Sequence, residues 1–217
     1  QTFANKCNRE LITMWLTDWM FSSFYHFLSI WVEGYLRKYR LATAGMVSGD
    51  VLEVGAGTGA NLPYYRRDIN LTLLEPSPAM RKRLSRKIMK LKRKDQVVSD
   101  RGEKLPFPDD SFDYVVSTLT LCSVRDSKAV LSEIRRVLRV GGILYFYEHV
   151  AADQGITRWF QDKLNSMWKI WAGGCNLNRQ IDLEIQTGGF RVVRISRFRL
   201  PISPPILRPS IVGFACV

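Results

Sequence analysis

The sequence contains no uninterrupted apolar run long enough to cross a membrane. Its aromatic-rich uncharged stretch runs from Trp19 to Val32 and covers about 14 residues, whereas a helical span needs about 20. Asp18, His26 and Glu33 also argue against a span. No cleavable signal peptide is recognisable, and because the chain begins at Gln1 we expect a fragment or a processed form.

Cysteine is scarce, and its spacing excludes the common zinc motifs. The four cysteines lie far apart in the sequence, and no two of them form a CxxC pair. We therefore expect no metal site and a reducing compartment. The four residues are Cys7, Cys122, Cys175 and Cys216.

Acidic residues are too few to balance the basic ones. The chain has 20 Asp and Glu against 32 Lys and Arg, which gives a net charge of +12 and a pI near 9.8. Such a surface attracts polyanions, of which nucleic acid and anionic lipid are the common ones. The chain has 217 residues, of which 46% are hydrophobic, and this fits one α/β domain with an appendage.

Much of the positive charge lies in one segment that the pattern predicts to be a helix. Ser77 is the expected N-cap before Pro78, and apolar residues recur at helical spacing from Met80 to Leu91. The opposite face favours an anionic partner surface, with a merely solvated face as the alternative. Its nine cations are Arg81, Lys82, Arg83, Arg86, Lys87, Lys90, Lys92, Arg93 and Lys94.

Glycines at alternate positions follow a short apolar strand at residues 51–54. The run Gly55-Ala56-Gly57-Thr58-Gly59 predicts a tight turn whose backbone amides can approach a ligand. Its spacing also satisfies the relaxed dinucleotide-binding fingerprint, so the turn alone leaves the cofactor open. Glu75 closes the next apolar strand 20 residues beyond Gly55, where a Rossmann unit places a carboxylate for ribose hydroxyls.

Strands and helices alternate along the rest of the chain. We expect a strand at residues 114–119, a helix at 128–139 that Gly141-Gly142 ends, and a strand at 143–149. This alternation predicts a parallel, doubly wound sheet. Two further strands, at 189–198 and 210–217, are expected to complete it as an antiparallel edge.

Two segments outside this pattern are rich in aromatic residues. Residues 11–36 predict either a helix pair that covers a ligand pocket or an interfacial helix followed by Arg37, Lys38 and Arg40 for lipid headgroups. A helix at 157–171 carries an apolar face that we assign to the core or to a lid. That face consists of Phe160, Leu164, Met167, Trp168 and Trp171.

Four ordered motifs identify a family resemblance. They are Glu53-x-Gly55-x-Gly57-x-Gly59, Glu75 at the end of the second strand, Leu105-Pro106-Phe107-x-x-x-Ser111-Phe112-Asp113, and Leu138-Arg139-x-Gly141-Gly142. Together they resemble the class I S-adenosylmethionine-dependent methyltransferases, in the branch of the ubiquinone and menaquinone biosynthesis enzymes. The resemblance implies a Rossmann-like, doubly wound, seven-stranded and mostly parallel sheet with an antiparallel C-terminal edge strand.

Shorter segments narrow the resemblance. Those around Asn61, Leu119 to Val124, Glu148 to Ala151, Gly174 to Leu177 and Arg208 to Gly213 look like the endoplasmic-reticulum and lipid-droplet-associated alkyl thiol methyltransferases. Domain boundaries follow: an N-terminal helical lid or membrane-associating segment at 1–45 and a methyltransferase domain at 46–217. The chain departs from the wider pattern in having Arg101-Gly102 before Glu103 and Val140 before the double glycine.

The resemblance implies a site for S-adenosylmethionine at the glycine turn. Glu53 would orient the turn and the cofactor's amino group, Glu75 would accept from the ribose hydroxyls, and Gly102 or Asp100 would meet the adenine. The full set of cofactor-binding residues that it implies is Glu53, Gly55, Ala56, Gly57, Gly59, Asn61, Glu75, Pro76, Gly102, Glu103 and Leu119.

Methyl transfer to sulfur needs little acid or base chemistry if the acceptor arrives as a thiolate. A dry, aligned site favours reaction of a sulfonium with a thiolate, because two charges become neutral products. His149 is the predicted base that ionises a thiol, with Glu148 beside it as the second catalytic residue; a structural histidine is the alternative. The acceptor pocket is assigned to Cys122, Cys175, Asn176 and Trp168.

The expected function is methyl transfer from S-adenosylmethionine to a small lipophilic acceptor at an anionic membrane or lipid-droplet surface. An alkyl thiol is the favoured acceptor, and a quinone or a phospholipid headgroup is the alternative. A hypothesis from another functional class is a non-catalytic cofactor-binding protein of a lipid droplet or membrane. We expect a monomer that does not bind nucleic acid. Its predicted location is the cytoplasmic face of the endoplasmic reticulum or a lipid droplet, with the cytoplasm as the alternative.

Overall fold

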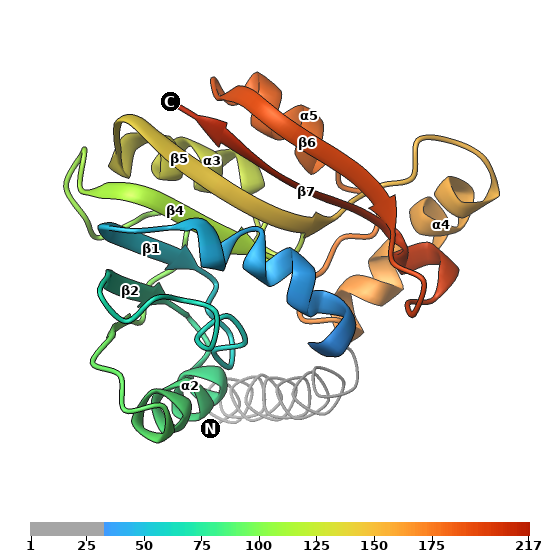
Figure 1. The fold of residues 1–217 in the computed structure, drawn as a ribbon. Helices are drawn as coiled ribbons and strands as arrows, with labels where there is room; N and C mark the ends of the chain where they lie inside the picture. Colours follow the sequence, from blue (N-terminus) through green and yellow to red (C-terminus); the bar gives the residue numbers. More distant parts are fainter. Residues whose placement is uncertain (1–32) are drawn as a thin grey trace, which may run out of the picture.

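The computed structural model describes residues 33–217, which form one sheet with helices on both faces (Figure 1). The predicted aromatic segment at residues 11–36 falls almost entirely outside this range. Its assignment as a pocket cover or an interfacial helix therefore stays a prediction, as does the boundary at residue 45.

The sheet has seven strands in the order β3-β2-β1-β4-β5-β7-β6. All neighbours from β3 to β5 pair in parallel, whereas β7 pairs antiparallel with both β5 and β6. The predicted fold class is confirmed. The edge strand on this side is β6, and β7 lies between β5 and β6. The strands are β1 (Asp50–Val54), β2 (Asn70–Leu74), β3 (Gln96–Val98), β4 (Phe112–Thr118), β5 (Leu138–His149), β6 (Arg191–Arg199) and β7 (Pro209–Cys216).

Helices cover the two faces of the sheet with separate apolar cores. On one face α3 and α5 pack over Leu52, Val54 and Leu144. On the other face α2 and the segment after the helix at residues 33–41 pack over Val51 and Val116. The helices are one at residues 33–41, α2 (Pro78–Lys90), α3 (Ser127–Val137), α4 (Ile156–Trp171) and α5 (Ile181–Thr187), with short 3-10 turns η1 (Ala44–Met46) and η2 (Pro205–Leu207).

The predicted cap and apolar stripe of α2 are confirmed. Ser77 Oγ accepts a hydrogen bond from the Met80 amide, and Met80, Leu84 and Ile88 are buried. The nine predicted cations do not all face solvent, however. Arg93 lies beyond the helix in an ion pair with Asp95 at 2.6 Å, and both side chains are only 6% exposed. Its assignment to the exposed basic face was wrong, because the chain turns back toward the sheet after Lys90.

The boundary between α3 and β5 differs from the prediction. The helix ends at Val137, and Gly141-Gly142 lies inside β5 instead of separating helix from strand. Leu138 already pairs with Phe112, and Ile143 pairs with Tyr114, so β5 carries extra residues in a bulge. A Cβ on Gly142 would lie 2.8 Å from the Arg139 carbonyl oxygen. The glycines therefore serve the bulge.

The apolar face of α4 points largely to solvent. Gln161 is the buried residue of this helix: its amide nitrogen donates to the carbonyls of Val150 and Ile206, and its oxygen accepts from the Ala152 amide. Of the two assignments of the apolar stripe, the core was wrong, because Phe160, Met167 and Trp171 are exposed, and the lid stays a prediction. Among residues 33–217, no helix combines the length and apolarity that a membrane crossing requires.

Candidate functional site

The glycine turn leaves β1 at the centre of the sheet. The amides of Gly55 and Ala56 both donate to the Leu74 carbonyl at 2.9 Å, and the Gly59 amide donates to Ala56. Gly55 has a φ of 72° and no room for a side chain, since a Cβ would lie 2.4 Å from Thr120. At Gly57 the φ is 57°, but a Cβ would meet nothing nearer than the Met80 sulfur at 3.9 Å. Gly55 thus packs against the loop after β4, while open space remains beside Gly57.

Glu75 at the end of β2 holds the turn from the side. One carboxylate oxygen accepts from the Gly57 amide and the other from the Ser77 amide, both at 2.8 Å. Pro76, next in the chain, has its carbonyl bound by the guanidinium of Arg81 at 2.7 Å. The structure therefore brings the predicted ribose acceptor next to the glycine turn.

Glu53 in β1 lies beneath the same turn, almost fully buried. Its Oε1 accepts from the Asn61 side-chain amide at 2.8 Å. No hydrogen bond of standard geometry reaches its Oε2 in residues 33–217, but the buried Tyr65 hydroxyl lies beside the carboxyl and lowers its pKa. Burial raises the pKa of this carboxyl from 4.5 to about 7, against the opposing effect of the Asn61 hydrogen bond. The hydrogen bond of Glu53 is to Asn61, in the segment after the glycine turn, and its predicted role toward the turn and the cofactor's amino group stays a prediction.

Arg40 completes this network and was missed as a site residue by the sequence reasoning. Its Nη1 donates to Asn61 Oδ1 at 2.6 Å, and its Nε pairs with Glu33 at 3.1 Å. The expectation that Arg40 meets lipid headgroups was wrong, because its side chain is only 2% exposed. The available signal was its position on the helix, four residues after the buried Leu36 and three before the buried Thr43.

Glu148 organises the loop after β4. Its Oε1 accepts from the Ser117 hydroxyl and from the amides of Thr120 and Leu121, and its Oε2 accepts from the Cys122 amide. Burial raises the pKa of this carboxyl, and the four donors oppose the rise. These contacts fix residues 117–122 in place, whereas a catalytic role for Glu148 stays a prediction.

The same loop contains a residue in an unusual conformation. Leu119 has a φ of 56°, which is rare for a residue with a branched side chain, and its amide donates to the Tyr147 carbonyl at 2.8 Å. Strain of this kind is common at functional sites. No pattern in the sequence marks it, because the conformation arises from contacts with β5.

The loop that was expected to meet the adenine lies near the start of α3. Gly102 is buried, and a Cβ there would lie 3.2 Å from both Val54 and Val130. Glu103 Oε1 accepts from the Arg125 amide at 3.0 Å. Glu103 therefore joins the loop after β3 to the loop after β4, and its role toward the cofactor stays a prediction.

The predicted acceptor residues come together beyond this loop. The sulfurs of Cys122 and Cys175 lie 4.0 Å apart, and Asn176 donates its backbone and side-chain nitrogens to the Cys122 carbonyl at 2.8 and 3.1 Å. His149 is buried at the end of β5, with Nε2 3.3 Å from the Ile206 carbonyl oxygen. The neighbouring Cys122, His149 and Trp168 lower the pKa of the Cys175 thiol against the effect of burial.

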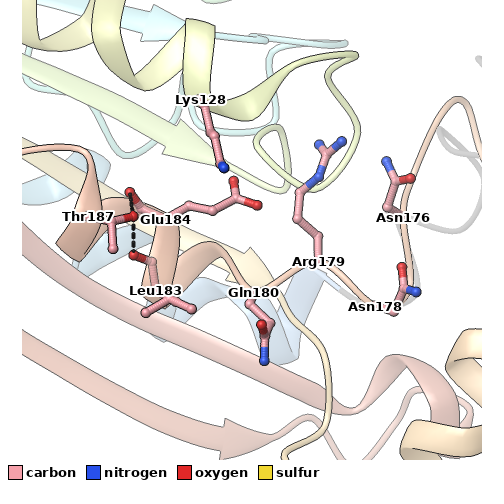
Figure 2. A pocket seen from close by; sticks show the side chains of 8 residues that line it. All are labelled: Lys128, Asn176, Asn178, Arg179, Gln180, Leu183, Glu184 and Thr187. Carbon is pink, nitrogen blue, oxygen red and sulfur yellow. Dashed lines mark hydrogen bonds between the residues drawn. The ribbon is translucent and has the colours of Figure 1, made fainter.

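A shallow pocket of about 580 Å³ lies next to α5 and is lined mostly by residues with polar side chains. Figure 2 shows the Arg179 guanidinium directed toward the loop after β4, and its Nη1 donates to the carbonyls of Leu121 and Val124 at 2.7 and 2.8 Å. Of the predicted acceptor residues only Asn176 lines this pocket. Its lining residues are Lys128, Asn176, Asn178, Arg179, Gln180, Leu183, Glu184 and Thr187.

Comparison with known proteins assigns the chain to a family. A family model described as a methyltransferase domain matches residues 52–146. The human thiol S-methyltransferase TMT1A is 37% identical over 169 residues, which are 76% of this chain and 69% of that protein. The chain belongs to the class I S-adenosylmethionine-dependent methyltransferases, in the family that includes the thiol S-methyltransferases.

More distant members of this methyltransferase class share part of the sequence or the fold alone. The phosphatidylethanolamine N-methyltransferase of Cereibacter sphaeroides is 35% identical over 121 residues, covering 55% of this chain and 60% of that one. A crystal structure from Thermotoga maritima, described as a possible histamine N-methyltransferase, aligns with a TM-score of 0.67 and 21% identity, over 94% of this chain and 99% of that one.

The residues of this methyltransferase fit its cofactor, S-adenosylmethionine. The space beside Gly57 admits a ligand close to the backbone, and Glu75 presents a carboxylate at the strand end. Beneath them, Glu53 keeps a buried oxygen that no hydrogen bond of standard geometry satisfies in the described residues, with the Tyr65 hydroxyl nearby, and such an oxygen suits an ammonium group. In residues 33–217, no cluster of three or more His, Cys, Asp or Glu is placed to hold a metal ion.

Proposed function

We propose that this methyltransferase transfers a methyl group to the sulfur of a small lipophilic thiol. The observation that carries the proposal is a buried histidine at the end of β5, next to the two cysteines and the loop that Glu148 fixes. When bound, S-adenosylmethionine supplies an electrophilic methyl group on a sulfonium. The thiol S-methyltransferases among the relatives support the same acceptor class.

The contacts of His149 make it suitable as a base. The Ile206 carbonyl can only accept, so the hydrogen bond at Nε2 places the proton on that nitrogen. The other nitrogen, Nδ1, then carries a lone pair; it is buried beside the Cys175 thiol, and no hydrogen bond of standard geometry reaches it within residues 33–217. A thiol that enters beside Cys175 can transfer its proton to Nδ1 and become the nucleophile.

The experiment compares the wild type with His149→Asn on a panel of alkyl and aryl thiols, with labelled cofactor. The variant should lose about 100-fold in kcat/KM for an alkyl thiol at neutral pH, because the thiol is then mostly protonated. The loss should shrink for acidic aryl thiols and at high pH, where the thiol ionises without help. A structural role would lower all rates equally.

Cofactor binding, measured by calorimetry, serves as the control for this comparison. The proposal fails if wild-type protein binds the cofactor and methylates no thiol of the panel. Label that appears in extracted phospholipid or in a quinone would favour those acceptors instead. Cofactor binding without transfer to any of these compounds would favour a non-catalytic role.

We further propose that the reaction takes place at an anionic membrane surface that α4 contacts. Ile156, Trp159, Ile170 and Trp171 are 55–75% exposed on this helix, and exposed Lys163 lies among them. Large apolar and aromatic side chains interspersed with a cation are typical of helices that lie in a lipid interface. Because α4 leads into the loop that carries Cys175, a lipophilic acceptor could reach the site from the lipid.

Flotation with anionic and neutral liposomes tests this surface. The double substitution Trp159→Ser, Ile170→Ser should weaken liposome binding. About 0.5 M salt should leave the binding of the wild type unchanged, because the contact is apolar. The matched control is Val140→Ser, which removes a 96% exposed apolar side chain from the bulge of β5. Equal binding of both variants would contradict the assignment to α4, and salt-sensitive binding would indicate the basic face of α2.

A further inference from the structure

We propose that Cys175 and Cys122 form a dithiol that reduces low-molecular-weight disulfides. In this reaction Cys175 attacks the disulfide and Cys122 resolves the product. This activity is separate from methyl transfer and requires no cofactor.

The proposal starts from the distance between the two thiols. Their sulfurs lie 4.0 Å apart, and both cysteines are free. The two segments are tied together by the pair of hydrogen bonds from Asn176 to the Cys122 carbonyl. A disulfide needs the sulfurs at about 2.05 Å, so the two sulfurs have to approach each other by about 2 Å to form the bond.

The two cysteines differ in access and in surroundings. Cys122 is 2% exposed, whereas Cys175 is only partly buried at the surface of the loop after α4. Cys122, His149 and Trp168 all lower the pKa of the Cys175 thiol, and the nitrogens His149 Nδ1 and Trp168 Nε1 are buried beside it with no hydrogen bond of standard geometry in the described part of the chain. Contact with Cys175, burial and nearby Glu148 raise the pKa of Cys122.

These differences set the order of the steps. The thiolate of Cys175 attacks one sulfur of a disulfide R–S–S–R, which forms a bond from Cys175 to R–S and releases R–S⁻. The Cys122 thiol then loses its proton and attacks Cys175 Sγ, which forms the Cys122–Cys175 disulfide and releases the second R–S⁻. The substrate gains two electrons, the cysteine pair loses two, and the released thiolates take up the protons of the two cysteines.

The reaction generates the acceptor class of the proposed methyl transfer next to the site that would use it. This link alone rests on the proposed function. The dithiol chemistry does not, because it follows from the two sulfurs and their neighbours.

The test uses the reduced protein with 4,4′-dithiodipyridine as the disulfide, without cofactor and in a Cys7→Ser, Cys216→Ser background that removes the other two cysteines. The background protein should release two thiopyridones per chain and end with a Cys122–Cys175 cross-link in the peptide map. Cys122→Ser should release one and retain a mixed disulfide on Cys175. Cys175→Ser should react at least about tenfold more slowly, because the thiol with the lowered pKa is gone.

A second measurement does not depend on how the variants fold. Limiting iodoacetamide on native wild-type protein should label Cys175 before Cys122 and Cys216 in the peptide map. A mixed disulfide that persists on the background protein, or faster labelling of Cys122 than of Cys175, would overturn the proposal. Methylation of a pre-reduced thiol, assayed separately, distinguishes this failure from a failure of the proposed function.

Discussion

Arg40 Nη1 donates a hydrogen bond of 2.6 Å to Oδ1 of Asn61, 21 residues further along the chain. Asn61 in turn donates to Glu53 and to the Thr118 hydroxyl, both at 2.8 Å. This chain of contacts connects the helix at residues 33–41 with β1, β4 and the loop after the glycine turn. The orientation of the buried Glu53 carboxyl therefore depends on a residue outside the strand and glycine turn at residues 50–59.

Replacing Arg40 should weaken both the fold and the cofactor site. Arg40→Met keeps the length of the side chain but leaves Asn61 Oδ1 without its charged donor, at a cost of about 2 kcal/mol in the free energy of unfolding. Cofactor affinity should also fall, because Asn61 no longer holds Glu53. Urea unfolding and calorimetry measure the two effects.

The control for Arg40 is Arg37→Met on the exposed side of the same helix. It removes the same charge without touching Asn61, so unfolding should change by less than about 0.5 kcal/mol. Equal effects of the two substitutions would show that charge, and not the bond to Asn61, matters.

Glu53 should make stability depend on pH in a particular direction. Its pKa is raised from 4.5 to about 7 in the folded chain, so the folded state binds more protons than the unfolded state between these values. Stability from this group is fully present below about pH 4.5 and is lost as the pH rises toward 7. At 1.36 kcal/mol per pKa unit, the loss is on the order of 3 kcal/mol.

Glu53→Gln tests this expectation, because glutamine resembles the protonated acid. The difference in unfolding free energy between variant and wild type should grow in favour of the variant from about pH 4.5 to about pH 7 and then level off. The same substitution should reduce cofactor affinity above pH 7, where the carboxylate is available to an ammonium group. A pH-independent difference between the two proteins would contradict the raised pKa.

Much of the fold could be predicted because each element carries a local pattern. Ser77 before Pro78 predicted the start of α2, and the glycine run predicted the turn after β1. The exposed face of α4 could not be predicted in the same way, since a helical apolar stripe is identical whether it meets a core or another surface. The Arg40 to Asn61 bond and the conformation of Leu119 depend on tertiary contacts that no local pattern contains.

Gly55 should not tolerate a side chain, because a Cβ would clash with Thr120, and a smaller residue at position 120 should relieve the clash. A Cβ there would lie 2.4 Å from both Oγ1 and Cγ2 of Thr120. Gly55→Ala should therefore destabilise the protein by about 2–3 kcal/mol, of which the positive φ accounts for roughly 1–2.

The double substitution separates the two causes of this loss. Gly55→Ala with Thr120→Gly should recover the steric part but not the part that comes from φ, which a double-mutant cycle in urea unfolding measures. Gly57→Ala is the comparison, because its φ is similar and its Cβ would be free of close contacts. It should lose less stability than Gly55→Ala and more cofactor affinity. Purely additive effects at Gly55 and Thr120 would exclude the predicted clash.

Glu148 should be required for the shape of the loop after β4 through both of its oxygens. Glu148→Gln replaces one of them by an amide group that points its hydrogens at backbone donors, so either the three donors to Oε1 or the Cys122 amide loses its acceptor. We expect a loss of about 1.5–3 kcal/mol in unfolding free energy and a lower kcat. Asp110→Asn, at an exposed carboxylate with positive φ that asparagine tolerates, should change neither quantity measurably.

Since Leu119 and Cys122 belong to this loop, hydrogen exchange in Glu148→Gln should increase at residues 117–122 and remain unchanged in β1. Unaltered exchange in the loop together with a lost kcat would instead assign Glu148 a direct part in the chemistry.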